Sequence, residues 1–247
     1  MYQAGLVSVS FRKLSPKEVI DAAAAAGLKC IEWGSDVHAP CTDIARLEEI
    51  AAMQKQAGLF CCSYGTYYRI GVNPVEEIRD YIKAARILGT NILRLWCGAK
   101  SSTEFTQEDL DVFYAQCREL AKIAEEEKVI LCMECHGWTL TDEAEPALKL
   151  MQAVNSPAFC MYYQPSQYRT PEENITYAKM LAPYTYHLHV FNWEGDKQFP
   201  LREGLDDWRK YLACFPEDHT LLLEFMPDHR VESLPTEAAA LFDLIGG

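Results

Sequence analysis

Four side chains that could bind a divalent metal ion recur at intervals of about one strand and one helix. Glu134, Gln164, His189 and Glu224 each close a short apolar segment, and successive members are 30, 25 and 35 residues apart. Two carboxylates, an imidazole and an amide oxygen form an oxygen-rich set. Such a set suits Mn²⁺ or Mg²⁺ better than a structural Zn²⁺ site, although Co²⁺ or Zn²⁺ could also bind. We therefore predict one metal site built from these four residues.

The predicted ligands are plausible because a carboxylate at the end of a buried strand is costly unless it is paired or metal-bound. Glu134 shares a strand face with Ile130 and Cys132, and Glu224 shares one with Leu222, since alternate residues point to the same side. A single glutamate at a strand end is often a surface residue. Two glutamates with a histidine on an intervening strand favour a metal site.

The segments that must position these residues alternate along the chain between short β-rich apolar runs and longer amphipathic runs. The expected strands cover residues 4–10, 28–33, 59–64, 92–97, 129–135, 158–163, 184–190 and 220–225. The expected helices cover residues 15–26, 41–57, 74–88, 106–128, 141–153, 171–181, 204–215 and 235–245. Eight such units predict a (β/α)8 TIM barrel, with residues 1–247 as a single domain.

Local signals support this division. Ser15, Pro16 and Glu18 form a capping box with proline in the first turn, which predicts a helix start. An open doubly wound sheet is the alternative architecture. It usually has fewer strands at this length, and a glycine-rich phosphate loop follows its first strand. Here residues 8–12 read Ser-Val-Ser-Phe-Arg instead, which favours the closed barrel.

Composition limits the possible partners. The 247 residues carry a formal net charge of −13, which repels phosphate backbones and argues against nucleic-acid binding. No apolar run reaches the ~18 residues of a membrane span, and no basic segment precedes a long apolar run at the start. Most of the ten cysteines fall within apolar segments, as buried thiols do. We expect a protein with reduced thiols, located in the cytoplasm.

Other polar and aromatic residues are expected where the strands end, and these are candidates for contact with a substrate. They are His136, His38, Glu32, Trp96, Trp193 and Arg69. Trp33 and Trp138 are also expected at strand exits, where four tryptophans could form an aromatic wall against a sugar ring. Each has an alternative: core packing for a tryptophan, loop structure for His38 and an ion pair for Arg69. Arg94 is expected to form an interior ion pair.

Several segments carry a resemblance to a known family. The segments are 31–40, 63–71, 93–98, 133–136, 163–165, 187–193 and 223–225. Together they resemble the xylose isomerase-like TIM-barrel superfamily, and in particular its sugar phosphate isomerase/epimerase-like subgroup. The resemblance covers nearly the whole chain but does not fix one substrate.

The resemblance implies specific roles. In the superfamily a glutamate, an aspartate, a histidine and a glutamate hold one divalent metal, and Glu134, His189 and Glu224 match three of them. Gln164 stands in place of the aspartate, and Gln167 stands where a substrate-contacting histidine would be. The two glutamates both bind the metal and transfer protons through a metal-stabilised enediolate. The implied function is isomerisation or epimerisation of a sugar, sugar phosphate or keto-polyol, and family habit suggests a homo-oligomer.

Three other functions are compatible with parts of this pattern. A lyase or dehydratase acting on a keto-sugar derivative would use the same metal site. A sugar-binding relative without activity would explain the neutral side chains of Gln164 and Gln167. A DNA-repair endonuclease of the same superfamily needs many histidines and a basic groove, which six histidines and the acidic charge contradict.

Overall fold

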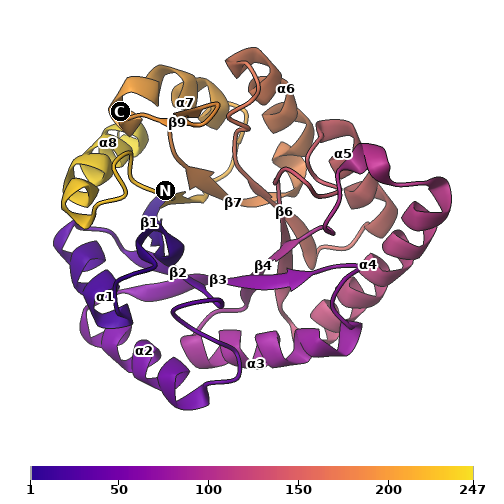
Figure 1. The fold of residues 1–247 in the computed structure, drawn as a ribbon, viewed down its shortest axis with the longest axis horizontal. Helices are drawn as coiled ribbons and strands as arrows, with labels where there is room; N and C mark the ends of the chain where they lie inside the picture. Colours follow the sequence, from indigo (N-terminus) through magenta and orange to yellow (C-terminus); the bar gives the residue numbers. More distant parts are fainter. Residues whose placement is uncertain (1, 247) are drawn as a thin grey trace.

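Eight parallel strands form a closed barrel at the centre of the computed structural model, which describes residues 2–246 (Figure 1). The strands are β1 (Gln3–Val7), β2 (Cys30–Gly34), β3 (Phe60–Arg69), β4 (Ile92–Trp96), β5 (Ile130–Glu134), β6 (Phe159–Tyr163), β7 (Thr185–Val190) and β10 (Thr220–Leu223). Each strand pairs with the next one along the chain, and β10 closes the barrel against β1. The predicted (β/α)8 barrel is confirmed.

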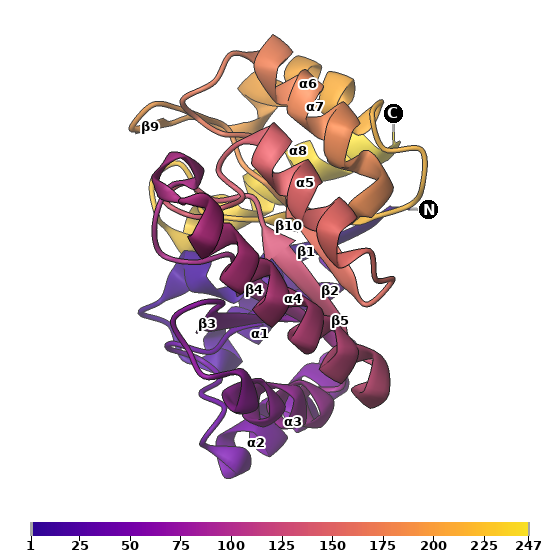
Figure 2. The ribbon, with the colours of Figure 1, turned by 90° about the vertical axis from the view of Figure 1, so that its right-hand side faces the viewer.

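Eight α-helices form a ring outside the strands (Figures 1 and 2). They are α1 (Pro16–Ala25), α2 (Ile44–Gln56), α3 (Ile78–Leu88), α4 (Gln107–Glu127), α5 (Ala144–Val154), α6 (Pro171–Leu181), α7 (Leu205–Leu212) and α8 (Leu234–Gly246). Short 3₁₀ turns are η1 (Ser8–Phe11), η2 (Val75–Glu77), η3 (Ser102–Glu104), η4 (Ala182–Tyr184), η5 (Leu201–Gly204) and η6 (Val231–Ser233). The capping box predicted at Ser15 is present, with both reciprocal hydrogen bonds to Glu18.

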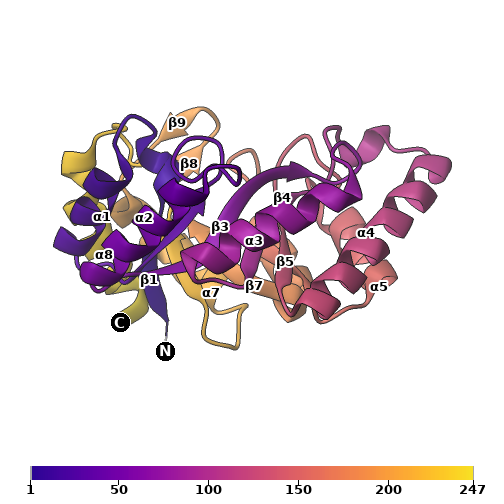
Figure 3. The same ribbon diagram turned by 90° about the horizontal axis from the view of Figure 1, so that it is seen from below.

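Two features differ from the sequence prediction. Strand β3 runs to Arg69 rather than ending near Tyr64, and its register against β4 shifts between Gly65 and Arg69. A small antiparallel hairpin, β8 (Trp193–Glu194) with β9 (Lys197–Gln198), follows β7. Figure 3 shows this hairpin on the opposite side of the barrel from the two termini. The hairpin therefore belongs to the end where the strands finish.

The buried apolar residues form two clusters, one on each face of the barrel strands. Most apolar residues pack between the barrel and the helices. A smaller cluster fills the barrel interior and includes Val7, Cys30, Cys62, Cys132 and Leu222. Strands buried on both faces have no polar–apolar alternation, so their sequence does not show which residues point inward. In β2 the alternate residues Cys30 and Glu32 point into the barrel.

Gly5 in β1 lies where the barrel interior has no room for a side chain. A Cβ atom there would lie 2.8 Å from the Cys30 carbonyl oxygen, 2.5 Å from its sulfur and 2.6 Å from Leu222. We expect Gly5→Ala to lower the free energy of unfolding by about 1–3 kcal/mol, as overpacking does. Gly137→Ala is the matched control, because a Cβ atom on Gly137 would have no neighbour within 4 Å. Equal urea midpoints for the two variants would contradict this packing.

The ten cysteines are free thiols, and seven of them are buried. Cys41, Cys160 and Cys214 are partly exposed. Burial raises the pKa of the Cys160 thiol to about 11 and also raises the pKa of Cys41 and Cys214. Because the thiolate is the reactive form, we expect at most these three to react with a thiol-specific disulfide reagent at pH 8. The other seven should react only after unfolding in guanidinium. Rapid modification of more than three thiols in the folded protein would show that the interior is open.

Crossing a lipid bilayer requires a helix that is both long and apolar. No helix within residues 2–246 meets both requirements.

Candidate metal centre

Three side chains at the centre of the barrel converge as a metal site requires. Glu134 is the last residue of β5, His189 lies near the end of β7, and Glu224 directly follows β10. One ligand atom from each lies within 4.8 Å of the others, and all three residues are buried. The Nδ1 atom of His189 is 3.5 Å from Glu134 Oε1 and 3.3 Å from Glu224 Oε2. The structure therefore brings three of the four predicted ligands together.

The fourth predicted ligand, Gln164, directly follows β6, which lies between β5 and β7 in the barrel. Its Oε1 atom is 3.0 Å from Nδ1 of His189, on the same side of the ring as the two carboxylates. Gln164 thus lies beside the three converging residues. Its role as a metal ligand stays a prediction. An amide oxygen is a weaker metal ligand than a carboxylate oxygen.

Glu134 is held from one side by two nitrogen donors. Its Oε2 atom accepts hydrogen bonds from Nη1 of Arg94, at 2.7 Å, and from the indole nitrogen of Trp96. Its Oε1 atom faces His189. Burial alone would raise the pKa of Glu134, but the charge of Arg94 and the contact with His189 together outweigh burial and lower the pKa to about 2. The carboxylate is therefore ionised and has one oxygen directed at the predicted metal position.

A second buried carboxylate lies on the far side of His189. Glu32 in β2 is fully buried, and its Oε1 atom is 3.2 Å from Nε of Arg94 and 3.4 Å from Nε2 of His189. Its Oε2 atom accepts a 2.6 Å hydrogen bond from Ser63. Gly65 leaves room for this arrangement, because a Cβ atom there would lie 2.7 Å from Glu32 and 2.9 Å from Arg94.

These contacts form a closed cycle of four charged or ionisable side chains, which we call the lumen ring. Glu32 contacts Arg94, Arg94 contacts Glu134, Glu134 contacts His189, and His189 contacts Glu32. Each member is at most 3% exposed. The predicted interior ion pair of Arg94 is confirmed, although the sequence did not identify its partners. Sequence reasoning also missed the supporting hydroxyls of Ser63 and Tyr162, which are 2.8 Å apart.

The charge of this region fits a divalent cation. Glu32, Glu134 and Glu224 provide three carboxylates, whereas Arg94 is the one permanent cation that contacts any of them among the described residues. Ionised carboxylates would leave two unbalanced negative charges in a buried region, which one divalent ion neutralises. Without such an ion His189 takes that role. Burial would lower the pKa of His189, but Glu224 and Glu32 outweigh burial and raise the pKa well above its usual value.

Three predicted substrate contacts form a stack at the rim, beside Glu134. The ring of His136 stacks on Trp96, with centroids 4.6 Å apart, and the guanidinium of Arg69 lies 3.8 Å from the centroid of Trp96. All three side chains are partly exposed. The long β3 explains how Arg69 reaches this position, since Arg69 pairs in register with Trp96 on β4. The stack holds an imidazole and a guanidinium against the indole of Trp96 at the rim.

Two other predicted contacts lie along the same end of the barrel. Gln167 lines a hollow of about 210 Å³ together with His136 and Gln164. Gln167 also lines a neighbouring hollow of about 650 Å³ with Trp193, which packs against Phe225 with ring centroids 5.6 Å apart. Gln167 therefore lines both hollows, one together with His136 and Gln164 and the other together with Trp193.

The structure places Glu32 and His38 away from solvent. His38 is fully buried, with Nδ1 3.2 Å from the Ser8 hydroxyl and Nε2 3.1 Å from the Leu14 carbonyl oxygen.

The expected aromatic wall of four tryptophans does not form. Trp33 points from β2 into the helix layer, where its indole nitrogen donates to Gln54 at 2.9 Å. Trp138 is 76% exposed.

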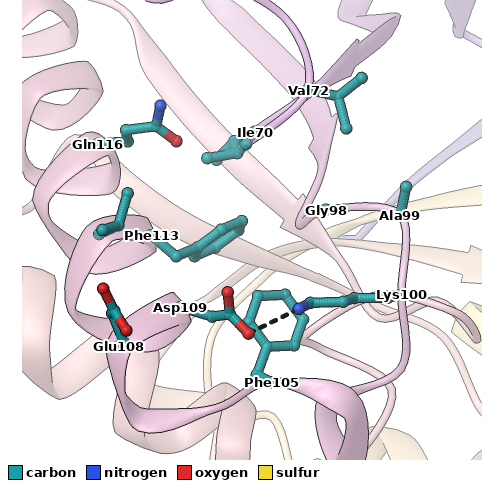
Figure 4. A pocket seen from close by; sticks show the side chains of 12 residues that line it. Ile70, Val72, Gly98, Ala99, Lys100, Phe105, Glu108, Asp109, Phe113 and Gln116 are labelled. Atoms are coloured by element: carbon teal, nitrogen blue, oxygen red, sulfur yellow. Dashed lines mark hydrogen bonds and ion pairs between the residues drawn. The ribbon is translucent and has the colours of Figure 1, made fainter.

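Another hollow, of about 480 Å³, lies outside this region between α4 and the loops after β3 and β4 (Figure 4). Phe105, Phe113 and Ile70 line it, and Lys100 pairs with Asp109 at 2.8 Å on one side (Figure 4). None of the converging ligands lines this hollow. The converging carboxylates and imidazole thus lie apart from this hollow.

Comparison with known proteins agrees with this geometry. Residues 20–242 match the family described as xylose isomerase-like TIM barrel, and the chain belongs to this family. A comparison with curated proteins gives no significant match.

Solved structures with the same fold include three of particular interest. A probable 3-DHS dehydratase involved in petrobactin synthesis in Bacillus anthracis has a TM-score of 0.80 and 19% identity, over 98% of both chains. A xylose isomerase-like protein from Mycobacterium smegmatis in complex with magnesium has a TM-score of 0.74 and 13% identity, over 99% of this chain and 98% of that one. A D-psicose 3-epimerase from Clostridium cellulolyticum H10, solved with D-tagatose, has a TM-score of 0.68 and 15% identity, over 99% and 98%. At these identities the likeness shows the fold alone.

Proposed function

We propose that this protein is a divalent-metal-dependent isomerase or epimerase of a small sugar, sugar phosphate or keto-polyol. The observation that carries the proposal is the buried convergence of Glu134, His189 and Glu224 at the carboxyl ends of the barrel strands, where barrels of this kind place their active sites. Mn²⁺ or Mg²⁺ suits the oxygen-rich donors, with Gln164 as a further ligand. When bound, the ion supplies electrostatic stabilisation of negative charge on substrate oxygens.

Glu134 and Glu224 are the proposed proton-transfer groups. They come from strands separated by β6 and β7, so they approach the central position from different directions. Glu134 is restrained by Arg94 and Trp96 and offers only Oε1, whereas no such guanidinium contacts Glu224 among the described residues. In this proposal each carboxylate accepts or returns a proton at a substrate carbon beside a carbonyl.

The substrate contacts proposed at the rim are His136, Trp96, Arg69, Gln167 and Trp193. The rings of Trp96 and His136, stacked on each other, provide apolar surface for a sugar, and the polar atoms of His136 and Gln167 suit its hydroxyl groups. Arg69 carries the one permanent positive charge among these five side chains, so it is the one that suits a phosphate or carboxylate. Glu32 and His38 are buried in this structure, so we do not include them among the contacts at the rim.

A lyase or dehydratase acting on a keto-sugar derivative is the second candidate. The structural similarity to a probable dehydratase, which extends over 98% of both chains, favours it. Removal of a proton beside a carbonyl is the first step in both reactions. Elimination then releases water or another leaving group, whereas isomerisation returns a proton.

Metal analysis and carbon-bound hydrogen exchange test the proposal together. Purified protein supplied with Mn²⁺ should retain about one equivalent, and it should exchange carbon-bound hydrogen for deuterium in a panel of ketoses and inososes. Glu134→Gln should lose exchange. Water release without isomerised product would favour the dehydratase. The proposed function fails if metal-replete protein holds no divalent ion.

A further inference from the structure

The two ring nitrogens of His189 face groups with different surroundings. Nδ1 faces Glu134, Glu224 and Gln164, at 3.5, 3.3 and 3.0 Å. Nε2 faces the other way, towards Glu32 Oε1 at 3.4 Å. Among residues 2–246, Nε2 is buried and has no hydrogen-bond partner of normal geometry. A buried ring nitrogen without a hydrogen-bond partner is costly, and the group that faces Nε2 is an ionised carboxylate, which can only accept.

Both carboxylate oxygens of Glu32 are held by neighbouring side chains. Ser63 donates to its Oε2 atom at 2.6 Å, and the Tyr162 hydroxyl lies 2.8 Å from Ser63. Nε of Arg94 holds Oε1 at 3.2 Å. These contacts leave Oε1 next to Nε2 of His189. A shift of a few tenths of an ångström would bring the pair to normal hydrogen-bond distance.

We propose that Glu32 is a positioning residue, which accepts the Nε2 proton of His189 and thereby directs the lone pair of Nδ1 at the metal. Histidines that bind metals commonly donate their second N–H group to a carboxylate, which fixes the tautomer and raises the basicity of the ligand. The inference rests on the proposed metal-dependent function. It gives Glu32 a role that acts through another side chain rather than by contact with substrate.

The first test measures the Mn²⁺ dissociation constants of metal-stripped variants, from the electron paramagnetic resonance signal of free Mn²⁺. Glu32→Gln keeps the shape of the side chain but removes its charge, and Arg94 retains Glu134 as a partner. We expect this variant to bind Mn²⁺ about 10–100-fold more weakly than the unaltered protein. Glu237→Gln is the matched control, because Glu237 is also buried and accepts a backbone N–H from Leu201 at 2.7 Å. Its affinity should change less than about threefold, well below that range.

A variant that preserves the carboxylate guards against misfolding. Ser63→Ala removes the hydroxyl that holds Glu32 while keeping the charge. It should weaken Mn²⁺ binding by a smaller factor than Glu32→Gln, with unchanged circular dichroism. If Glu32→Gln does not fold, the absence of any change in Ser63→Ala overturns the proposal.

The second test reads the tautomer directly from ¹⁵N shifts of the histidine rings in Mg²⁺-loaded protein. His189 is identified among the six histidines by comparison with His189→Gln. We expect a protonated Nε2 and a deprotonated Nδ1. Two results would overturn the role of Glu32 but leave the proposed function standing. They are a proton on Nδ1, and equal Mn²⁺ affinity in Glu32→Gln and the unaltered protein. Failure of the unaltered protein to bind Mn²⁺ overturns both this role and the proposed function.

Discussion

Arg94→Met should lower the free energy of unfolding of the metal-free protein by about 3–5 kcal/mol. Arg94 contacts Glu32 and Glu134, and all three side chains are at most 3% exposed. Their removal from water is already costly, and the loss of the guanidinium leaves both buried carboxylates without this cationic partner. Methionine fills much of the same volume, so the expected loss comes mainly from unpaired charge rather than from a cavity. Urea unfolding followed by circular dichroism measures the effect.

Arg79→Met is the matched control for this prediction. Arg79 also pairs with a glutamate, Glu127 at 2.6 Å, but it is 51% exposed. Exposed ion pairs contribute about 0–1 kcal/mol, so this variant should unfold near the midpoint of the unaltered protein. Similar losses in the two variants would contradict the importance we give to the buried contacts. If Arg94→Met does not fold, Arg94→Lys retains the charge and should show a smaller loss.

Glu224→Gln should abolish the stabilisation of the protein by Mn²⁺. A ligand that binds only the folded state, present at 100 times its dissociation constant, stabilises that state by about 2.7 kcal/mol. Glu224 provides one of the three converging ligand atoms, and an amide is a poorer ligand than a carboxylate. Each variant is compared with itself, with and without Mn²⁺, because Glu224 also contacts His189 when no metal is bound. The shift of the unfolding midpoint on adding Mn²⁺ measures the effect.

Glu237→Gln controls for the general effect of changing a buried glutamate in α8. It should retain the Mn²⁺-dependent shift in full, since Glu237 contacts Leu201 and not the ligand cluster. The prediction is wrong if Glu224→Gln is stabilised by Mn²⁺ as strongly as this control. Such a result would move the binding site away from the barrel centre.

The fold could be predicted from the sequence because each of the eight units carries its own local signals. Apolar segments of strand length alternate with capped amphipathic segments, and all eight expected strands and helices are present. The hairpin β8–β9 could not be predicted in the same way. Its strands have two residues each, which is too short for any periodicity, and its position depends on contacts with the rest of the barrel.

The candidate ligands were also predictable, because Glu134, His189 and Glu224 stand at the ends of strands that a parallel barrel brings together. The direction of side chains within β2 was not. All five residues of β2 are buried, so the strand has no polar face that would show Glu32 pointing inward and Trp33 outward. The link from Arg94 to both glutamates depends on the packing of β2, β3, β4 and β5 side by side, which brings together residues 62 and 40 positions apart.

The lumen ring also has a mechanical consequence for the barrel. Its four members stand on β2, β4, β5 and β7, so they link strands from opposite arcs of the wall. Separation of any one of these strands at its carboxyl end would break contacts on two others. Local opening at this end therefore becomes a cooperative event of the whole circumference, and not the fraying of one strand. In amide exchange, the carboxyl ends of these four strands should open with a common free energy.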